Sequence, residues 1–573
     1  MSRDPAAAAP PAARPSSAPL RPRRGVSRIG RGESIRIRRG IAWIGRAARG
    51  AAAIALLAPA ALLAQAPSRA PTIDSVAIVR HSVFDPDETS FWLLSLVNKL
   101  HVTTRAYVVR RELLFEAGEP YDSARVAESA RNLRRLRVFR SVRIDSATVD
   151  GRLVITVTTD DGWSTRPDFR FKSTGGELDY TIALIEDNLL GTATQASVLY
   201  RNTPDRTSTT FGFRQPRLIA GRVGLTARWD DRSDGQRYGA LLAQPFFTLS
   251  SRNSWSVFGE RRDERVLLYR DGRRQPADSV FRDYSIGRLD LAHALRAGSD
   301  GYLRVGIAAQ VREDRFAPGP GLPGTTRSAS SGAVGGWLEL RRARFLTTTG
   351  YNALSREEDV DLSSVLRVGA WLAPGAFGYE RGGIGPEVLA HVGTRIPSGF
   401  AAASLGAHGL FTSAGLDSGS VHLAGTAAWL PTPRHLAVLH VSAGAIEDPL
   451  PGTEYDLGLG AGPRGFRQHA FTGDRMFFAT AEYRYGLAPD FLKVVDVGIA
   501  AFADVGGAWF DGSPSRSGWD AGIGLRLGPS RAPDLEANRI DLVYRSGNSR
   551  EPAGWVLVVA KGFAFASGLR GER

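Results

Sequence analysis

The nearest approach to a cofactor-binding motif in this chain is Gly460-Ala461-Gly462-Pro463-Arg464-Gly465, which has the G-x-G-x-x-G spacing of a dinucleotide-binding loop. In such sites the loop leads into a helix whose amino terminus binds the pyrophosphate. Here no helical pattern follows, and a proline and an aromatic residue stand in the loop. The sequence contains no G-x-S-x-G nucleophile elbow, no H-E-x-x-H zinc helix and no Walker loop. We therefore expect no catalytic residues and no cofactor.

Metal chemistry is equally poorly supported by the residue pattern. Acidic clusters at Asp160-Asp161-Gly162 and at Asp230-Asp231 with Asp234-Gly235 lack the ligand spacing of a calcium loop and read better as turn acids. The nine histidines are scattered, and the absence of cysteine excludes disulfides, thiolate zinc sites and thiol nucleophiles. No two carboxylates stand apart as an acid/base pair. We expect no metal site and a protein that is not an enzyme.

Most of the chain consists of short segments in which apolar and polar residues alternate, separated by clusters of glycine, aspartate, serine and proline. Over residues 164–566 this alternation is typical of transmembrane β-strands. The clearest segment places Phe477, Ala479, Ala481, Tyr483 and Tyr485 on one face and Thr480, Glu482 and Arg484 on the other. A soluble β-sandwich alternates too, but about 400 residues exceed the usual size of one domain, about 250. We predict a mainly β fold, a transmembrane antiparallel β-barrel of about sixteen strands at roughly 25 residues per strand.

Residues 67–163 show a mixed pattern instead. A strand pattern at Ile73–Ile78 precedes two stretches of helical periodicity, the first capped by Thr104 and the second by Asp122 or Ser123. Two further strand patterns follow, joined by the strong hairpin signal Asp150-Gly151. The order β-α-α-β-β predicts a small α+β domain of about ninety residues, enough for a core of its own.

Residues 1–66 have the features of an export leader. An arginine-rich start precedes the apolar segment Ala51–Leu63 and a small-x-small site at Ala64-Gln65-Ala66, near which we predict signal-peptide cleavage. A nucleic-acid tail and a membrane anchor are the competing interpretations, although an anchor needs about twenty apolar residues. The leader holds many of the arginines behind the net charge of +15, so we expect no nucleic-acid partner. The first forty residues are long for a signal peptide, which leaves the true start codon open.

Four barrel segments, following this small domain, make the chain resemble the outer-membrane assembly-factor superfamily, which includes BamA, TamA, the mitochondrial sorting-and-assembly barrel protein and the two-partner-secretion transporters. They are Glu186–Thr192, which contains the early-barrel signature Asp187, Asn188, Gly191 and Thr192, then Phe211–Arg217, Gly462–Phe466, and Phe502–Gly506. The resemblance covers about residues 73 to 565. It implies that residues 67–163 form a periplasmic POTRA domain ahead of a sixteen-stranded barrel in the outer membrane.

The resemblance places Arg464, Gly465 and Phe466 in a long extracellular loop that folds back into the barrel. Such a loop needs an anchor, and the planar fork of arginine pairs bidentately with a carboxylate. Asp504, on the polar face of its strand, is the partner we predict, with Glu482 as the second choice. Glycine at 465 would let the backbone pass close to the barrel wall, where Phe466 packs beside it. The alternative is an ordinary loop with a solvated arginine.

The resemblance also implies a seam between the first strand, near Phe169 and Phe171, and the last, which we place from Trp555 through Phe563 to Phe565. If weakly paired, this seam can open sideways and template a new strand. The sequence departs from the family in showing only one POTRA-like domain and in continuing past Phe565 with a tail at residues 567–573.

These expectations lead to three functional hypotheses. The first is an assembly factor that receives unfolded outer-membrane polypeptides in the periplasm and inserts them, with outer-membrane lipid and periplasmic or inner-membrane assembly proteins as further partners. Exposed strand edges of the small domain would bind such clients by backbone hydrogen bonds. The second is a two-partner-type transporter of a secreted polypeptide, and the third is a passive channel. All three share one fold.

Overall fold

The computed structural model describes residues 70–84, 101–174, 177–219, 222–270, 272–275, 280–318, 327–448, 452–459, 461–531 and 536–565. All of them belong to one compact unit, Leu57–Arg573. The leader predicted at residues 1–66 and the tail predicted at 567–573 lie outside the described residues. Among the helices described, none combines the length and apolar character needed to cross a bilayer.

The N-terminal domain has the predicted β-α-α-β-β order. Its elements are β1 (Ser75–His81), α3 (Ala106–Glu112), α4 (Ser123–Arg135), β2 (Phe139–Val149) and β3 (Arg152–Asp161). The sheet order is β1-β3-β2, with β1 parallel to β3 and β2 antiparallel to it. Asp150 and Gly151 both have positive φ, as a two-residue hairpin turn requires.

The two helix starts of this domain differ in how they are capped. Asp122 caps α4 as predicted, since its carboxylate accepts hydrogen bonds from the backbone of Ala124 and Arg125. The prediction that Thr104 caps the first helix is wrong: α3 has Arg105 at its N-cap without a side-chain bond. The hydroxyl of Thr104 donates instead to the buried carboxylate of Asp161, 3.0 Å away. A buried carboxylate needs donors more than a helix end in contact with water does.

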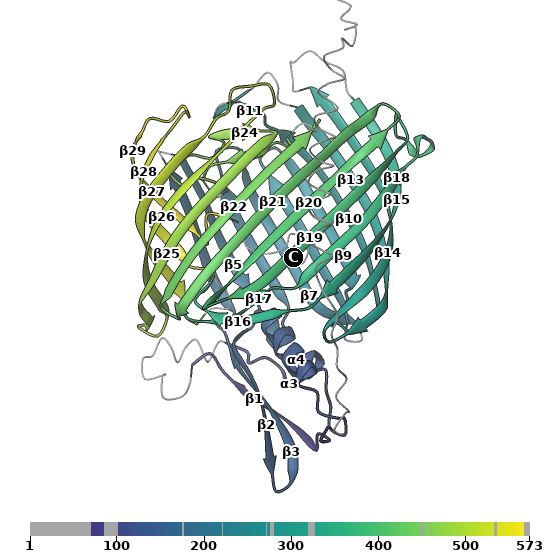
Figure 1. Ribbon diagram of the computed structural model, residues 1–573, viewed down its shortest axis with the longest axis vertical. Coiled ribbons are helices and arrows are strands. Elements are labelled where there is room, and N and C mark those ends of the chain that lie inside the picture. Colours follow the sequence, from purple (N-terminus) through teal and green to yellow (C-terminus); the bar gives the residue numbers. More distant parts are fainter. Residues whose placement is uncertain are drawn as a thin grey trace, which may run out of the picture. The chain divides into compact units, whose positions relative to one another are not determined.

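The remaining strands form one antiparallel barrel (Figure 1). They are β4 (Thr165–Thr174), β5 (Glu177–Glu186), β6 (Gln195–Asn202), β7 (Thr207–Ile219), β8 (Val223–Arg232), β9 (Gly235–Gln244), β10 (Asn253–Val266), β13 (Val280–Gly298), β14 (Gly301–Pro318), β15 (Arg327–Arg342), β18 (Ser364–Ala373), β19 (Gly383–Ile396), β20 (Gly399–Thr412), β21 (Gly415–Thr432), β22 (His435–Glu447), β25 (Arg475–Phe491), β26 (Val495–Trp509), β27 (Gly518–Pro529), β28 (Asn538–Gly547) and β29 (Gly554–Lys561). The helical turns η2 (Leu189–Gly191) and η4 (Gly375–Phe377) lie between strands.

The predicted fold class is confirmed, but the predicted strand count is not. The described residues form twenty barrel strands rather than about sixteen. The spacing is shorter than we assumed because several hairpins are very tight, such as the one in which Gly298 pairs with Gly301. The last described barrel strand, β29, stops at Lys561.

Apolar side chains alternate along the barrel strands in the way that a lipid-facing surface requires. Leu289, Leu291, Ile307, Val311 and Leu557 are exposed, whereas Arg282, Arg304, Asp504 and Arg526 on barrel strands are buried. An apolar exterior with charged groups inside is the pattern of a membrane barrel and the reverse of a soluble protein.

Within the described part of the chain, three short two-stranded sheets lie outside the barrel ladder. Two of them, β11 (Tyr269–Arg270) with β12 (Arg273–Arg274) and β23 (Tyr455–Leu457) with β24 (Phe471–Gly473), belong to connections at the barrel end opposite the N-terminal domain. The third, β16 (Phe345–Thr349) with β17 (Glu357–Asp361), belongs to the connection between β15 and β18. Figure 1 shows β11 and β24 at one end of the barrel and β16 and β17 at the other.

The core of the N-terminal domain generates a stability prediction. Leu133 on α4 is fully buried between the helices and the sheet. Leu133→Ala should destabilise this domain by about 2–5 kcal/mol, because it removes buried methyl groups and leaves a cavity. Limited proteolysis should then cut residues 101–163 faster, while the barrel keeps its heat-modifiable gel mobility. Val149→Ala, at an exposed position on β2, is the matched control and should have no effect; equal cleavage of both variants would contradict the packing.

Candidate functional site

Arg464 is the centre of the candidate site. It lies in the connection between β22 and β25, and its side chain is 1% exposed. The guanidinium binds Asp504 of β26 bidentately, with Nε 2.6 Å from Oδ2 and Nη2 3.1 Å from Oδ1. Its Nη1 donates to Oε2 of Glu482 on β25, at 2.8 Å. The structure therefore brings together the arginine and both carboxylates that the sequence singled out.

The two strands place these carboxylates side by side on the inner wall. Thr480 pairs directly with Asp504 in the β25–β26 ladder, and Glu482 is two residues further along the same face. Tyr483 and Val505, which point the other way, are exposed on the outer surface. The loop must therefore enter the barrel for Arg464 to reach its partners.

The pKa of Arg464 reflects these contacts. Burial disfavours the charged form, but the carboxylates of Asp504 and Glu482 raise the pKa above its ordinary value. The ring of Phe502 lies 3.7 Å from its Cζ and covers the guanidinium on one side. Arg464 thus keeps its charge in a dry environment.

Gly465 lies against the barrel wall. Its backbone N–H donates to Asp520 of β27 at 2.8 Å, and its carbonyl accepts from Nη1 of Arg545 on β28 at 2.8 Å. A Cβ at this position would lie 3.0 Å from Cγ1 of Val543 and 3.2 Å from Cβ of Arg545. A larger residue would push the loop away from the wall.

Phe466 is fully buried and packs edge-on against Phe471, with 5.1 Å between ring centroids. Its ring occupies the space that a side chain at Gly518 would need, since a Cβ there would lie 2.3 Å from the Phe466 ring. Three consecutive loop residues therefore contact the barrel wall through charge, backbone and aromatic packing in turn.

Sequence reasoning missed how far the charged network extends. Arg484 donates to Glu482 at 2.5 Å, and Arg526 donates to Asp541 of β28 at 2.6 Å. All four side chains are buried. The available signal was charged residues recurring on the polar faces of four consecutive strands, but the pairing depends on the barrel register.

The early-barrel motif joins the barrel to the N-terminal domain. Asn188 Nδ2 donates to Oγ1 of Thr104 at 2.9 Å, and the backbone N–H of Arg105 donates to the carbonyl of Gly191 at 2.9 Å. Gly191 has φ +74°, and a Cβ there would lie 2.8 Å from the carbonyl oxygen of Thr103. Glycine at position 191 thus permits the close approach of the early-barrel turn to the segment before α3.

The other two residues of this motif hold the turn itself. Asp187 accepts a hydrogen bond from Nε of Arg166 at 3.1 Å. Thr192 Oγ1 donates to the carbonyl of Leu189 at 2.7 Å.

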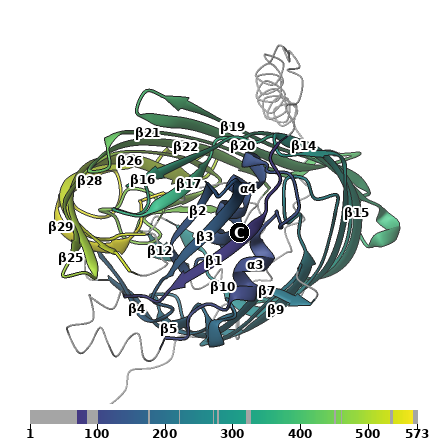
Figure 2. The ribbon, with the colours of Figure 1, turned by 90° about the horizontal axis from the view of Figure 1, so that it is seen from below.

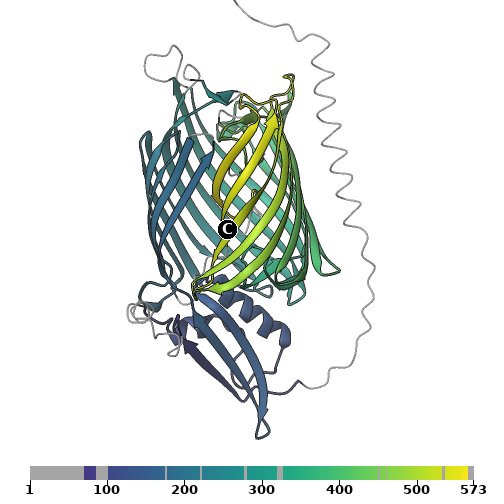
Figure 3. The same cartoon turned by 90° about the vertical axis from the view of Figure 1, so that its left-hand side faces the viewer.

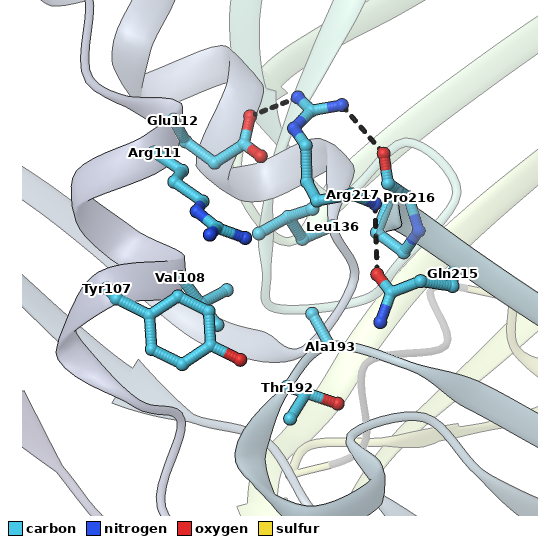
Figure 4. A pocket seen from close by; sticks show the side chains of 10 residues that line it. All are labelled: Tyr107, Val108, Arg111, Glu112, Leu136, Thr192, Ala193, Gln215, Pro216 and Arg217. Atoms are coloured by element: carbon cyan, nitrogen blue, oxygen red, sulfur yellow. Dashed lines mark hydrogen bonds and ion pairs between the residues drawn. The ribbon is translucent and has the colours of Figure 1, made fainter. Parts of the chain in front are cut away.

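An ion pair between the two domains lies near this motif. Arg217 of β7 donates to Glu112 of α3 at 2.8 Å (Figure 4). Burial raises the pKa of Glu112, against the opposing effect of Arg217. The adjacent cavity, lined also by Tyr107 and Gln215, has a volume of about 20 Å³. Since it has room for about one water molecule, it is part of the domain joint and not a ligand site.

Among the described residues, the seam joins β29 to β4 through one residue pair, Val559 with Ser173. By contrast, β28 and β29 share eight pairs, and β4 and β5 share ten. Phe169, Phe171 and Trp555 belong to the seam strands and are exposed. Figure 3 shows the C-terminal strands, in yellow, beside the first barrel strands, in blue.

The prediction that Phe563 and Phe565 belong to this seam is wrong. If the ladder continued from Val559, Phe563 would come opposite Phe169, but Gly562 adopts φ +70° and turns the chain away. Phe563 packs 5.4 Å from the ring of Tyr351, and Phe565 stacks on His440 at 4.0 Å. The two aromatics continue the strand pattern in sequence. Inside the barrel, however, they bury more apolar surface than they would at the thinly paired seam.

A second polar cluster joins the connections at the barrel end opposite the N-terminal domain. His469 contacts Asp205 at 3.1 Å and Asp456 at 2.5 Å, and its ring stacks on Tyr269 with 3.7 Å between centroids. Burial disfavours the imidazolium, but hydrogen bonds to the two carboxylates raise the pKa of His469 to about 9. We call Asp205, Tyr269, Asp456 and His469 the loop latch.

The buried ion pairs of Arg464 predict that its substitution strongly reduces the stability of the folded loop. Arg464→Ala should destabilise the folded loop by about 3–5 kcal/mol, because Asp504 and Glu482 lose their buried counter-ion. The temperature of the heat-modifiable mobility shift should fall, and trypsin should cut residues 461–475. Arg464→Lys should not restore stability, since an ammonium group cannot bind bidentately.

Arg467→Ala is the matched control for that experiment. Arg467 lies in the same loop but is partly exposed, and its pair with Glu551 is 3.9 Å long. We expect a change of about 0–1 kcal/mol. Equal losses in Arg464→Ala and Arg467→Ala would contradict the anchor.

The loop latch predicts a pH dependence. Since the folded pKa of His469 lies above the ordinary 6.5, its stabilisation is complete below about pH 6.5 and is lost as pH rises through about 9. NMR titration of labelled histidine, with the resonance assigned by His469→Gln, should give a midpoint near 9. A midpoint near 6.5 would show that the two carboxylates do not hold the imidazolium.

Comparison with known protein families gives a match for this part of the chain. Residues 452–533 match the Omp85 superfamily domain, a span that contains Arg464, Glu482, Asp504 and Asp520. No curated protein matches the chain significantly.

The similar solved structures have low sequence identity to this chain. BamA from Haemophilus ducreyi lacking POTRA domains 1–3 is 12% identical, with 85% of this chain and 84% of that chain covered and a TM-score of 0.36. CdiB from Escherichia coli is 15% identical, with coverage of 94% and 100% and a TM-score of 0.44. CdiB from Acinetobacter baumannii is 10% identical, with coverage of 86% and 74% and a TM-score of 0.41. The family match falls on the anchored loop and on strands that bind it, so this part of the chain is similar to the Omp85 superfamily domain.

Proposed function

We propose that this protein is an outer-membrane assembly factor, without enzymatic activity, that takes an unfolded β-rich polypeptide from the periplasm and inserts it through the seam between β4 and β29. The proposal rests on the thin pairing at that seam, where the described residues form one residue pair. Each backbone hydrogen bond contributes only about 0.5–1.5 kcal/mol net, so this seam costs far less to open than its eight-pair and ten-pair neighbours.

The proposal assigns the N-terminal domain the role of a POTRA domain in the periplasm. Its sheet order leaves β1 and β2 as edge strands. An edge strand binds an extended polypeptide through backbone hydrogen bonds, without requiring a particular client sequence. The contacts of Asn188 and Gly191 keep this domain at the barrel end where β4 begins.

The competing function is secretion of one polypeptide through the lumen, as in a two-partner-type transporter. That route would have to displace the anchored loop, the β16–β17 hairpin and the segment after β29, all of which lie inside or across the barrel. The seam route leaves the buried Arg464 network intact. This difference favours insertion over secretion, and equally over a passive channel.

The seam is tested by locking it. The chain has no native cysteine, so Ser173→Cys/Val559→Cys can form a single disulfide across β4 and β29. In proteoliposomes, the oxidised protein should lose most of its ability to insert an unfolded β-barrel client, and reduction should restore it.

Ile540→Cys/Val559→Cys is the matched control, because it shares one position but links β28 to β29. Oxidation of this variant should leave insertion unchanged. Full insertion by the oxidised seam variant would contradict the lateral route and favour passage through the lumen.

A further inference from the structure

The connection between β15 and β18 is longer than the barrel requires. Residues 343–363 form the hairpin β16–β17, whereas two residues suffice to join β13 to β14. We call residues 343–363 the mouth hairpin. Among the described residues its ladder consists of five pairs, all between β16 and β17. The hairpin can therefore move without breaking the barrel sheet.

The mouth hairpin extends from its base on β15 and β18 to the opposite wall. A Cβ at Gly350, near its tip, would lie 2.9 Å from the carbonyl oxygen of Pro433, in the turn between β21 and β22. Ser355 donates a hydrogen bond to Asp496 at the start of β26. Figure 2 shows β16 and β17 lying across this end of the barrel. The hairpin thus crosses the mouth next to the N-terminal domain.

One side of the mouth hairpin is apolar and faces the barrel interior. Leu346, Tyr351, Val360 and Leu362 share a hydrophobic cluster with Phe400 of β20, Leu436 and Val438 of β22, and Phe563. The ring of Tyr351 lies 5.0 Å from that of Phe400. Arg484, a member of the anchor network, donates to the carbonyl of Tyr351 at 3.3 Å. The hairpin therefore covers side chains of the lumen wall.

The other side of the mouth hairpin contacts the N-terminal domain through charged side chains. Arg134 of α4 binds Asp359 bidentately, at 2.8 and 3.0 Å. Arg356 donates to the carbonyl of Phe139 at 2.8 Å, and Arg131 of α4 stacks on Phe345 at 4.3 Å. Arg134 and Asp359 are both partly exposed to water. Such a pair is modest in strength and can exchange with solvent.

We propose that the mouth hairpin is a gate that closes this end of the barrel and is held shut by helix α4 through the pair of Arg134 with Asp359. When the N-terminal domain moves on its joint, the pair separates and the hairpin leaves the apolar wall. The gate controls access to the lumen, so it goes beyond the proposed insertase role and does not depend on which client is inserted. A purely structural brace would hold the same contacts but would not respond to α4.

The gate is tested by labelling a residue that it covers. Leu436→Cys places one thiol in an otherwise cysteine-free chain, at a position that is 2% exposed beneath the hairpin. A water-soluble maleimide should label the folded full-length protein slowly. Adding Arg134→Ala or Asp359→Ala should raise the labelling rate about fivefold or more, because a small change in free energy shifts the fraction open by that factor. The charge swap Arg134→Asp/Asp359→Arg should return the rate close to that of the parent.

Two further variants keep the result unambiguous, with folding checked by heat-modifiable mobility. Arg125→Ala removes an arginine of the same helix that pairs with Glu119 inside the N-terminal domain, and it should leave the rate unchanged. Replacement of residues 345–361 by a short Gly-Ser linker should give the fastest labelling. Equal rates in the parent and both single variants, a swap as fast as the single variants, or slow labelling without the hairpin would each overturn the proposal.

Discussion

The buried guanidinium of Arg464 is the interaction on which the interior of this barrel depends. It satisfies Asp504 and Glu482 together, two carboxylates that adjacent strands place close to one another in a site without water contact. Removing charges from water is costly, and the cost is offset only where geometry and hydrogen bonding are both good. The same constraint determines the loop residues that follow. Gly465 must pass close to β27 and β28, and Phe466 must fill the space beside Gly518.

This network stabilises one part of the barrel wall through contacts with the loop, whereas the seam has no such contacts among the described residues. Strands β25 to β28 are linked to the loop through Glu482, Asp504, Asp520 and Arg545. The β29–β4 seam lies outside these contacts and has one ladder pair among the residues that the structure describes. At the opposite side of the network, Arg484 connects Glu482 to the mouth hairpin. A lateral opening at the seam therefore need not disturb the anchor, whereas transport along the lumen axis would.

Much of this architecture follows from local sequence patterns, and the exceptions have physical causes. The N-terminal element order and the polar face that carries Glu482 come from periodicities within single strands or helices. Predicting the partners of Arg464 required the family resemblance as well, because periodicity cannot place a loop. The predicted strand count was wrong because tight turns such as Gly298–Gly301 carry little sequence signal. Phe563 and Phe565 continue a strand pattern, and only the turn at Gly562 and the interior cluster around Tyr351 divert them. The mouth hairpin was missed because its strands alternate like barrel strands.

The most direct test of an assembly role is depletion of the protein in its own cells, with folded outer-membrane barrel proteins quantified by heat-modifiable gel mobility. We expect a broad loss of folded barrels, and an equal loss in a strain whose only copy carries Arg464→Ala, provided that the variant itself reaches the membrane. Unchanged levels of folded barrels after depletion would contradict a general assembly role and point to a dedicated transporter or a passive channel.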